Sequence, residues 1–113
     1  MKLFRRSAEP TIRGAADLLG IWQLVQSDDL GYQDAELDIR EGGRMFYAIH
    51  DEGKWAIMCL TYRIEGDTIV SDQPSAPRED RTRFSIEPDG TLILNRQGQR
   101  SWFRRGPKRA PEV

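Results

Sequence analysis

The stretch "LLGIWQLVQ", residues 18–26, decides the fold prediction, because the sequence pattern changes within it. Before it, "TIRGAADLL" (11–19) has the composition of a short helix. After it, "IWQLVQS" (21–27) alternates in the way a strand does and carries Trp22 on one face. Gly20 stands between the two patterns, and glycine commonly ends a helix. We therefore expect Gly20 to be a hinge between a short helix and a first strand.

Seven further stretches read as strands, because each is short, rich in β-branched or aromatic residues and bounded by turn residues. They are residues 35–40, 44–50, 54–65, 67–72, 81–87, 91–97 and 100–105. A second helix of useful length is not indicated, which argues against parallel βαβ units. Most connections have hairpin length, so strands that follow one another in sequence should pair antiparallel.

The lengths of the connections suggest a cup. The two long connections, 28–34 and 73–80, are the first and fifth and should lie at one end of the strands. The turns at the other end are all tight. Eight antiparallel strands in this order can close on themselves and so remove their exposed edges. The predicted fold is all-β, an eight-stranded antiparallel up-and-down barrel with a short N-terminal helix, and an open sandwich is the alternative.

The predicted domain organisation is one barrel domain over residues 11–106, between flexible tails at 1–10 and 107–113. Each end of the chain is basic and the body between them is acidic, although the net charge is only −1. We interpret the basic ends as solvated termini whose deletion leaves the fold intact. A nucleic-acid interface is not favoured, because the acidic body argues against a large basic face.

A family resemblance rests on the residues around Gly20 and Trp22. A short helical turn followed by Gly-x-Trp at the head of a meander of eight strands resembles the lipocalin signature, and the predicted fold is lipocalin-like. In addition, "TYRIEGDTI" (61–69) is similar to a hairpin pattern of small bacterial lipocalin-like domains of the calycin superfamily. The Thr-Asp-Tyr motif and the disulfide pattern of the classical secreted lipocalins are absent. The resemblance covers about residues 12–106.

The resemblance implies a role for residues at both ends of the barrel sequence. In lipocalins the tryptophan plugs the closed end, and an arginine near the end of the last strand packs across it. The candidates here are Trp22 with Arg104 or Arg105. Most small lipocalin-like domains have no assigned activity, so the resemblance implies a fold more than a function.

Catalytic and metal-binding chemistry is weakly indicated. His50, the only histidine, lies beside Asp51 and Glu52 and could act as a general acid or base, but a surface turn is the favoured interpretation. Cys59 lies in the middle of a strand, and with a single cysteine no intramolecular disulfide forms. No Cys/His spacing suggests zinc. We therefore predict no catalytic residue, no metal and no cofactor.

The interior of the barrel is the better candidate for a binding site. If Phe84 points inward, we expect a ligand site at the open end. Its predicted residues are His50, Tyr62, Phe84, Arg96, Arg100 and Trp102. Arginine at the mouth of an apolar cup binds carboxylates in fatty-acid-binding barrels, and a guanidinium makes charge-assisted bonds to anions. The alternative is that Arg96 and Arg100 flank a solvated turn.

The predicted function is binding of a small apolar or amphiphilic molecule with a polar or anionic head. The alternatives are a protein–protein interaction module with a filled barrel, and a small barrel isomerase or cyclase, which the lack of an acid–base constellation disfavours. A homodimer is left open. No apolar run is long enough to span a membrane, and the start of the chain lacks the apolar region of a secretory signal, so a cytoplasmic location is expected.

Overall fold

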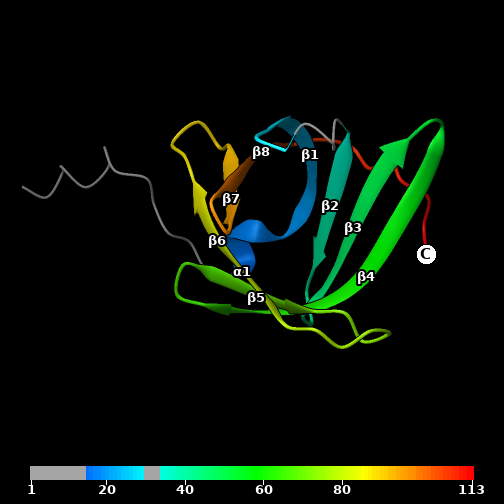
Figure 1. The fold of residues 1–113 in the computed structure, drawn as a ribbon. Coiled ribbons are helices and arrows are strands. Elements are labelled where there is room, and N and C mark those ends of the chain that lie inside the picture. Colours follow the sequence, from blue (N-terminus) through cyan, green and yellow to red (C-terminus); the bar gives the residue numbers. More distant parts are fainter. Residues whose placement is uncertain (1–14, 30–33) are drawn as a thin grey trace, which may run out of the picture.

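The protein folds as a closed barrel of eight antiparallel strands (Figure 1). The computed structural model describes residues 15–29 and 34–113. The elements are α1 (Ala15–Leu18), β1 (Gly20–Ser27), β2 (Ala35–Arg40), β3 (Arg44–Asp51), β4 (Lys54–Glu65), β5 (Thr68–Asp72), β6 (Asp80–Ile86), β7 (Leu92–Arg96) and β8 (Gln99–Arg105). The all-β up-and-down barrel with a short N-terminal helix is confirmed, and the sandwich alternative is wrong.

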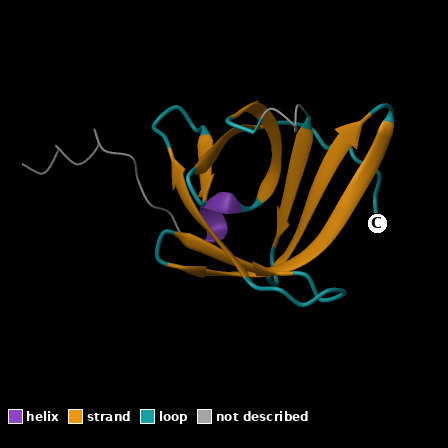
Figure 2. Cartoon of the chain, viewed as in Figure 1, coloured by secondary structure: helices purple, strands orange, loops and turns teal. Residues whose placement is uncertain are grey.

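Each strand pairs with the next one in sequence, and β8 pairs back with β1 to close the ring (Figure 2). The predicted helix at 11–19 is described from Ala15 to Leu18, and its first four residues lie outside the described residues. Gly20 follows with a φ of 125°, a backbone conformation that favours glycine. Gly20 therefore joins helix to strand as expected. Within the described residues no helix is long and apolar enough to cross a membrane.

The barrel has two different ends. We call the end that carries α1, the β2–β3 turn, the β4–β5 turn and the β6–β7 turn the closed end, and the other end the open end. Because the strands alternate in direction, both long connections, β1–β2 and β5–β6, join strand ends at the open end. This arrangement matches the lengths of the connections in the sequence.

The hydrophobic core fills the barrel from the closed end. Its most buried members, Leu18, Trp22, Leu92 and Phe103, are at most 1% exposed, and they belong to α1, β1, β7 and β8. The apolar side chains that pack against this core and are only partly buried come from both ends of the barrel, namely Leu19, Leu24, Tyr47, Leu60, Tyr62, Ile64 and Leu94. The large core side chains are thus most fully buried around Trp22 at the closed end.

The inward face of β8 differs from the prediction. We expected Arg100 and Trp102 to line the interior, but Phe103 is the buried residue and lies opposite Leu24 and Leu92. Residues opposite one another in an antiparallel pair share a face, so Trp102 faces outward with its neighbours at 100 and 104. The two aromatic residues of "RSWFRR" are adjacent, and alternation alone does not choose between them.

The C-terminal segment also differs from the prediction of a flexible tail. We call residues 106–112 the C-terminal strap. The strap runs back across the outer face of β1 and β2 (Figure 1). The strap covers Glu36 of β2, which is 1% exposed and accepts hydrogen bonds from the N–H groups of Arg109 and Ala110. Lys108 places its ammonium 3.4 Å from both Glu36 and Asp38. Opposite charges and backbone donors therefore hold the basic end of the chain against acidic β2.

Candidate functional site

The closed end is plugged by Trp22, which α1 and β8 hold from two sides. The indole Nε1 donates a hydrogen bond of 2.8 Å to the carbonyl oxygen of Leu18 at the end of α1. The guanidinium of Arg105 lies 4.2 Å from the centre of the Trp22 ring. Such a stacked cation is attracted by the negative face of the ring. Trp22 is thus fixed in orientation as well as buried.

Arg105 also ties the helix to the last strand. Its two terminal nitrogens donate to the carbonyl oxygens of Leu19, at 2.7 Å, and of Asp17, at 2.8 Å. These carbonyls lie at the C-terminal end of α1, where backbone acceptors lack partners within the helix. A Cβ at Gly20 would lie 2.6 Å from Arg105 Nη1, so glycine leaves room for this contact. Arg104 instead pairs with Asp89 in the β6–β7 turn.

The two arginines expected at the mouth are both paired with carboxylates of the chain. Arg96 Nε lies 2.5 Å from Asp80 Oδ2, at the open ends of β7 and β6. Arg100 lies on the outer face, 3.2 Å from Asp28 Oδ2, with its guanidinium 5.0 Å from the Trp102 ring. A guanidinium that already has a carboxylate partner attracts an incoming anion less strongly.

The other predicted site residues are dispersed. His50 lies on the outer face of β3, with Nδ1 3.2 Å from Asp34 Oδ2 and its ring 4.5 Å from that of Trp55. Phe84 is buried in the core and Tyr62 lies near the closed end. The structure therefore does not bring the six predicted residues together in one site.

Groups for acid–base, nucleophilic or metal chemistry do not converge in the described part of the chain. No three His, Cys, Asp or Glu side chains gather there in a way that could hold a metal ion. Cys59 is exposed on β4, and the Asp34 carboxylate beside His50 is shared with Arg109 of the strap. The Arg109 guanidinium and, to a lesser degree, His50 lower the pKa of Asp34, although burial opposes the shift.

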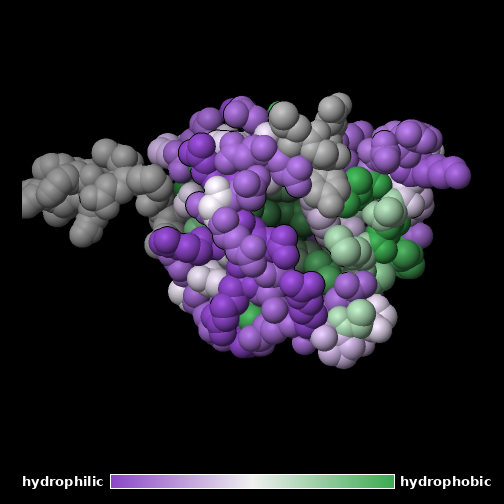
Figure 3. Space-filling view, viewed as in Figure 1, coloured by the Kyte–Doolittle hydropathy of each residue, from purple (hydrophilic) through white to green (hydrophobic). Residues whose placement is uncertain are grey.

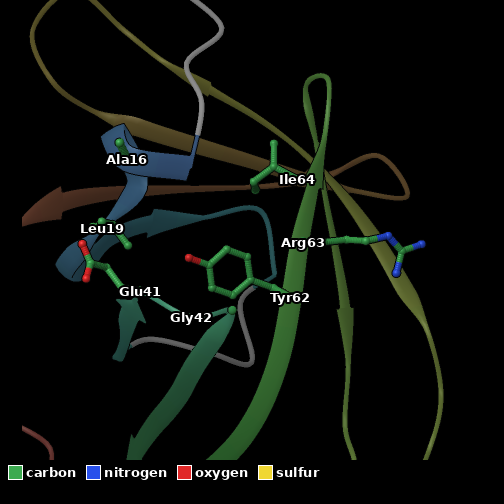
Figure 4. Close-up of a pocket in the computed structure, with 8 residues that line it drawn as sticks. Ala16, Leu19, Glu41, Gly42, Tyr62, Arg63 and Ile64 are labelled. Carbon is green, nitrogen blue, oxygen red and sulfur yellow. The ribbon is translucent and has the colours of Figure 1, made fainter.

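A concavity of about 460 Å³ lies at the closed end, between α1, the β2–β3 turn and the end of β4 (Figure 4). We call it the helix-side concavity. Its lining residues are Ala16, Leu19, Glu41, Gly42, Gly43, Tyr62, Arg63 and Ile64. Figure 4 shows the Tyr62 ring directed toward Leu19 and Glu41, while the Arg63 side chain points away. A volume of about 300–1,000 Å³ is usual for a small-molecule site.

The polar groups of the helix-side concavity are few. The Tyr62 hydroxyl donates a hydrogen bond of 2.9 Å to the carbonyl oxygen of Arg40. Burial, and secondarily the nearby Glu41 charge, raises the pKa of Tyr62. Arg63 forms ion pairs with Glu65 and Glu79 outside the concavity.

Glu41 is the remaining charged group of this site. Within the described residues its carboxylate makes no ion pair, and its side chain is exposed at the rim. The helix-side concavity therefore combines an apolar wall with one negative charge.

Sequence reasoning placed Tyr62 in a site at the open end, whereas the structure places it at the closed end, in a concavity that was not predicted. Its rim is the tight "EGG" turn at 41–43, where Gly42 and Gly43 have φ values of 83° and 77°. The glycines signalled a turn, and the neighbouring glutamate had no sequence feature that marked it as a binding residue. The approach of Leu19 to this turn depends on how α1 docks, which is a tertiary contact.

Hydrophilic side chains cover much of the molecular face in Figure 3, with apolar atoms gathered over β3 and β4 and in the middle of the face. Comparison of the chain with known protein families, with curated proteins and with solved structures finds no match.

Proposed function

We propose that this protein is a small-molecule-binding barrel and that its ligand occupies the helix-side concavity. The observation that carries the proposal is the composition of that site. Ala16, Leu19 and Ile64 offer an apolar wall, and Glu41 offers a carboxylate without an ion-pair partner among the described residues. Few polar groups on an apolar surface are typical of sites that bind and orient small ligands.

The charge of the site favours a particular ligand class. Glu41 repels an anionic head and attracts a cationic or hydrogen-bond-donating one. The anionic head expected from the sequence has less support, because Arg96 and Arg100 are paired with Asp80 and Asp28. The ligand we propose is a small apolar molecule with a polar, preferably cationic, head.

The proposal includes membership of the lipocalin-like group of small barrels. The support is the closed end, where Gly20, Trp22 and Arg105 take the relative positions that the resemblance implies. Barrels of this kind commonly hold ligands in the mouth. A ligand in the helix-side concavity would lie at the opposite end of the barrel, beside α1.

The test is a titration with matched amphiphiles that share one short alkyl chain and differ in the head, with trimethylammonium, hydroxyl and carboxylate forms. Amide shifts of Gly42, Gly43 and Ile64 in two-dimensional NMR report on the site. We expect saturable shifts in the order cationic, neutral, anionic. Ala16→Leu should abolish them, because its larger side chain occupies the concavity while leucine remains a good helix former.

Glu41→Gln provides the charge test, with Glu52→Gln in the exposed β3–β4 turn as the matched control. An exposed pair contributes about 0–1 kcal/mol, so the cationic ligand should bind up to roughly fivefold more weakly to Glu41→Gln and equally well to Glu52→Gln. Equal binding of all three amphiphiles to Ala16→Leu and to the native chain would refute the proposed site.

A protein–protein interaction module is the second candidate. Its support is the packed closed half of the barrel, where Trp22, Leu92 and Phe103 leave little exposed surface. A filled barrel acts through its outside, so the relevant surfaces are strand edges and outer faces.

A further inference from the structure

The strand β4 is longer than its neighbour β5, and this leaves one edge of the sheet open. β4 spans Lys54–Glu65, and β3 pairs with it from Lys54 to Thr61. On its other side, β5 pairs only with Thr61–Glu65. Among the described residues, the segment Lys54–Leu60 is thus paired with β3 alone. We call its unpaired side the β4 edge.

The backbone groups that point out of the β4 edge can be identified. The N–H of Tyr62 donates to the carbonyl oxygen of Gly43, so the backbone groups of Tyr62 point toward the β3 side. These groups alternate along an antiparallel strand. Those of Lys54, Ala56, Met58 and Leu60 therefore also point toward β3, and those of Trp55, Ile57 and Cys59 point out of the edge.

The hairpin geometry agrees with this assignment. Asp51 and Lys54 flank a turn made by Glu52 and Gly53, whose φ values are 51° and 78°. Positive φ at both turn residues is the two-residue hairpin turn that closes on a hydrogen-bonded pair, so Lys54 is bonded to β3. His50 and Trp55 then form a pair without backbone bonds, whose side chains approach closely, and their rings are 4.5 Å apart.

The β4 edge lacks the side chains that usually protect an exposed edge strand. After Lys54 the sequence reads "WAIMCL", with no charge, proline or glycine. Natural edge strands are usually protected from pairing by charged residues, by proline or by bulges. Figure 3 shows apolar atoms gathered over β3 and β4, on the face that it displays.

We infer that the β4 edge pairs antiparallel with the β4 edge of a second copy of this chain, with the two-fold axis at Ile57. In this register Ile57 lies opposite Ile57, and Trp55 lies opposite Cys59 of the second copy, so all outward-pointing backbone groups find partners. Ala56 lies opposite Met58 of the second copy on the inner face. Between positions 55 and 59 each face of the joined sheet therefore continues with apolar side chains, and Lys54 lies opposite Leu60 at the ends of the paired segment.

In other registers fewer of the outward-pointing backbone groups find a hydrogen-bond partner on the second copy. With the axis at Met58, Trp55 would meet Thr61 of the second copy, which already pairs with Asp72. With the axis at Ala56, Cys59 would meet Gly53 in the hairpin turn. A second copy is chosen over an unrelated peptide because this edge meets itself with uncharged side chains, Ile57 opposite Ile57 and Trp55 opposite Cys59.

The test measures the mass of the native chain in solution by light scattering over a range of concentrations. We expect a dimer that dissociates on dilution. Ile57→Pro should be monomeric at concentrations where the native chain is dimeric, because proline removes an N–H that points out of the edge and leaves the bonds to β3 intact. Ile57→Thr is the matched control: it keeps the N–H and a β-branched side chain, and should remain dimeric.

A disulfide trap tests the register and covers the case in which Ile57→Pro does not fold. In a Cys59→Ser background, Ala56→Cys combined with Met58→Cys should give a covalent dimer on mild oxidation, because these positions face each other without backbone bonds. Met58→Cys alone should not. A native chain that is monomeric at all concentrations, an Ile57→Pro variant that folds and stays dimeric, or no covalent dimer from the double variant would each overturn the inference.

Discussion

At the scale of single residues, the closed end depends on a few side chains that each make several contacts. Trp22 combines burial, one hydrogen bond and a stacked guanidinium. Arg105 combines that stacking with two bonds to carbonyls at the end of α1. The presence of glycine at position 20 follows from the same contacts, because a larger residue would displace the guanidinium.

Trp22→Ala should lower the free energy of unfolding by roughly 3–5 kcal/mol, the usual cost of truncating a large core aromatic. It also leaves the Leu18 carbonyl without its indole donor. Trp102→Ala is the control, since Trp102 is partly buried on the outer face. Urea unfolding followed by circular dichroism measures both, and equal losses would contradict the role of Trp22 as the plug.

Gly20→Ala should destabilise the protein by roughly 1–3 kcal/mol, because the φ of 125° is strained for alanine and its Cβ would collide with Arg105. Gly106→Ala is the instructive comparison. A Cβ there would lie 2.9 Å from Gln23 Cγ, so that side chain must shift, but no positive φ adds to the cost. A smaller loss of thermal stability is therefore expected for Gly106→Ala.

The sequence predicted the inward face correctly in β6 but not in β8. The expected inward position of Phe84 is correct, since it is 3% exposed and belongs to the core. In β8 the neighbours Trp102 and Phe103 are both aromatic, so the local pattern was ambiguous. The choice is made by distant residues, because Arg105 must reach Trp22 and Phe103 must meet Leu24.

At the scale of elements, the C-terminal strap is the feature that sequence reasoning missed. Its polar, proline-containing composition is typical of a loose end. Glu36 and Asp38 alternate with apolar residues in β2, which is typical of a solvated outer face. The basic end and the acidic body were visible in the sequence, but their contact joins positions far apart in the chain. The same holds for the helix-side concavity, where α1 meets the β2–β3 turn.

Deletion of residues 107–113 should destabilise the barrel by roughly 1–3 kcal/mol, since several hydrogen bonds to Glu36 and Asp38 are lost together. The melting temperature should fall by about 4–8 °C for each kcal/mol lost. Removal of Val113 alone, which is exposed, is the control and should have little effect. An unchanged melting temperature for the longer deletion would show that this segment does not stabilise the barrel.

The contacts of the strap with Glu36 and Asp38 should also make the free energy of unfolding depend on pH. Burial alone would raise the pKa values of Glu36 and Asp38, but donors from Arg109, Gln23, Arg40 and Lys108 outweigh burial and lower both. A lowered folded-state pKa means that the carboxylate stabilises the fold above its unfolded pKa, and that this contribution is lost as the pH falls through the folded value. Unfolding free energy should therefore drop below about pH 4. Glu36→Gln should be less stable at neutral pH and show a shallower drop.

At the scale of the whole molecule, packing is uneven along the barrel axis. The largest fully buried apolar side chains, Trp22 and Phe103, lie toward the closed end with Leu18 of α1, whereas Leu24 and Leu94, farther along β1 and β7, are partly buried. Eight strands and their order follow from local signals, namely hydrophobic alternation and turn residues, and these were predicted closely. The distribution of packing along the axis depends on where α1 inserts and on the strand registers, which no local pattern contains.

Hydrogen exchange should follow this gradient. We expect the slowest amides near Trp22, Ile39 and Phe103, and faster exchange toward the open end. In the monomeric Ile57→Pro variant the amides of Trp55 and Cys59 should exchange quickly, while that of Met58, which bonds β3, is protected. Two-dimensional NMR in heavy water measures each amide. Uniform protection along β4 would show that the β4 edge is covered within one chain.

The pairing of β1 with β8 has a kinetic consequence. Trp22 lies opposite Arg105, so the ring closes through a contact between two distant parts of the chain. Loop-closure entropy opposes such contacts until late in folding, and all-β chains dominated by them fold in about milliseconds to seconds. During synthesis β1 leaves the ribosome long before β8 does. During that interval one edge of β1 in the nascent chain has no strand to pair with. Correct folding therefore depends on how soon β8 is synthesised and pairs with β1.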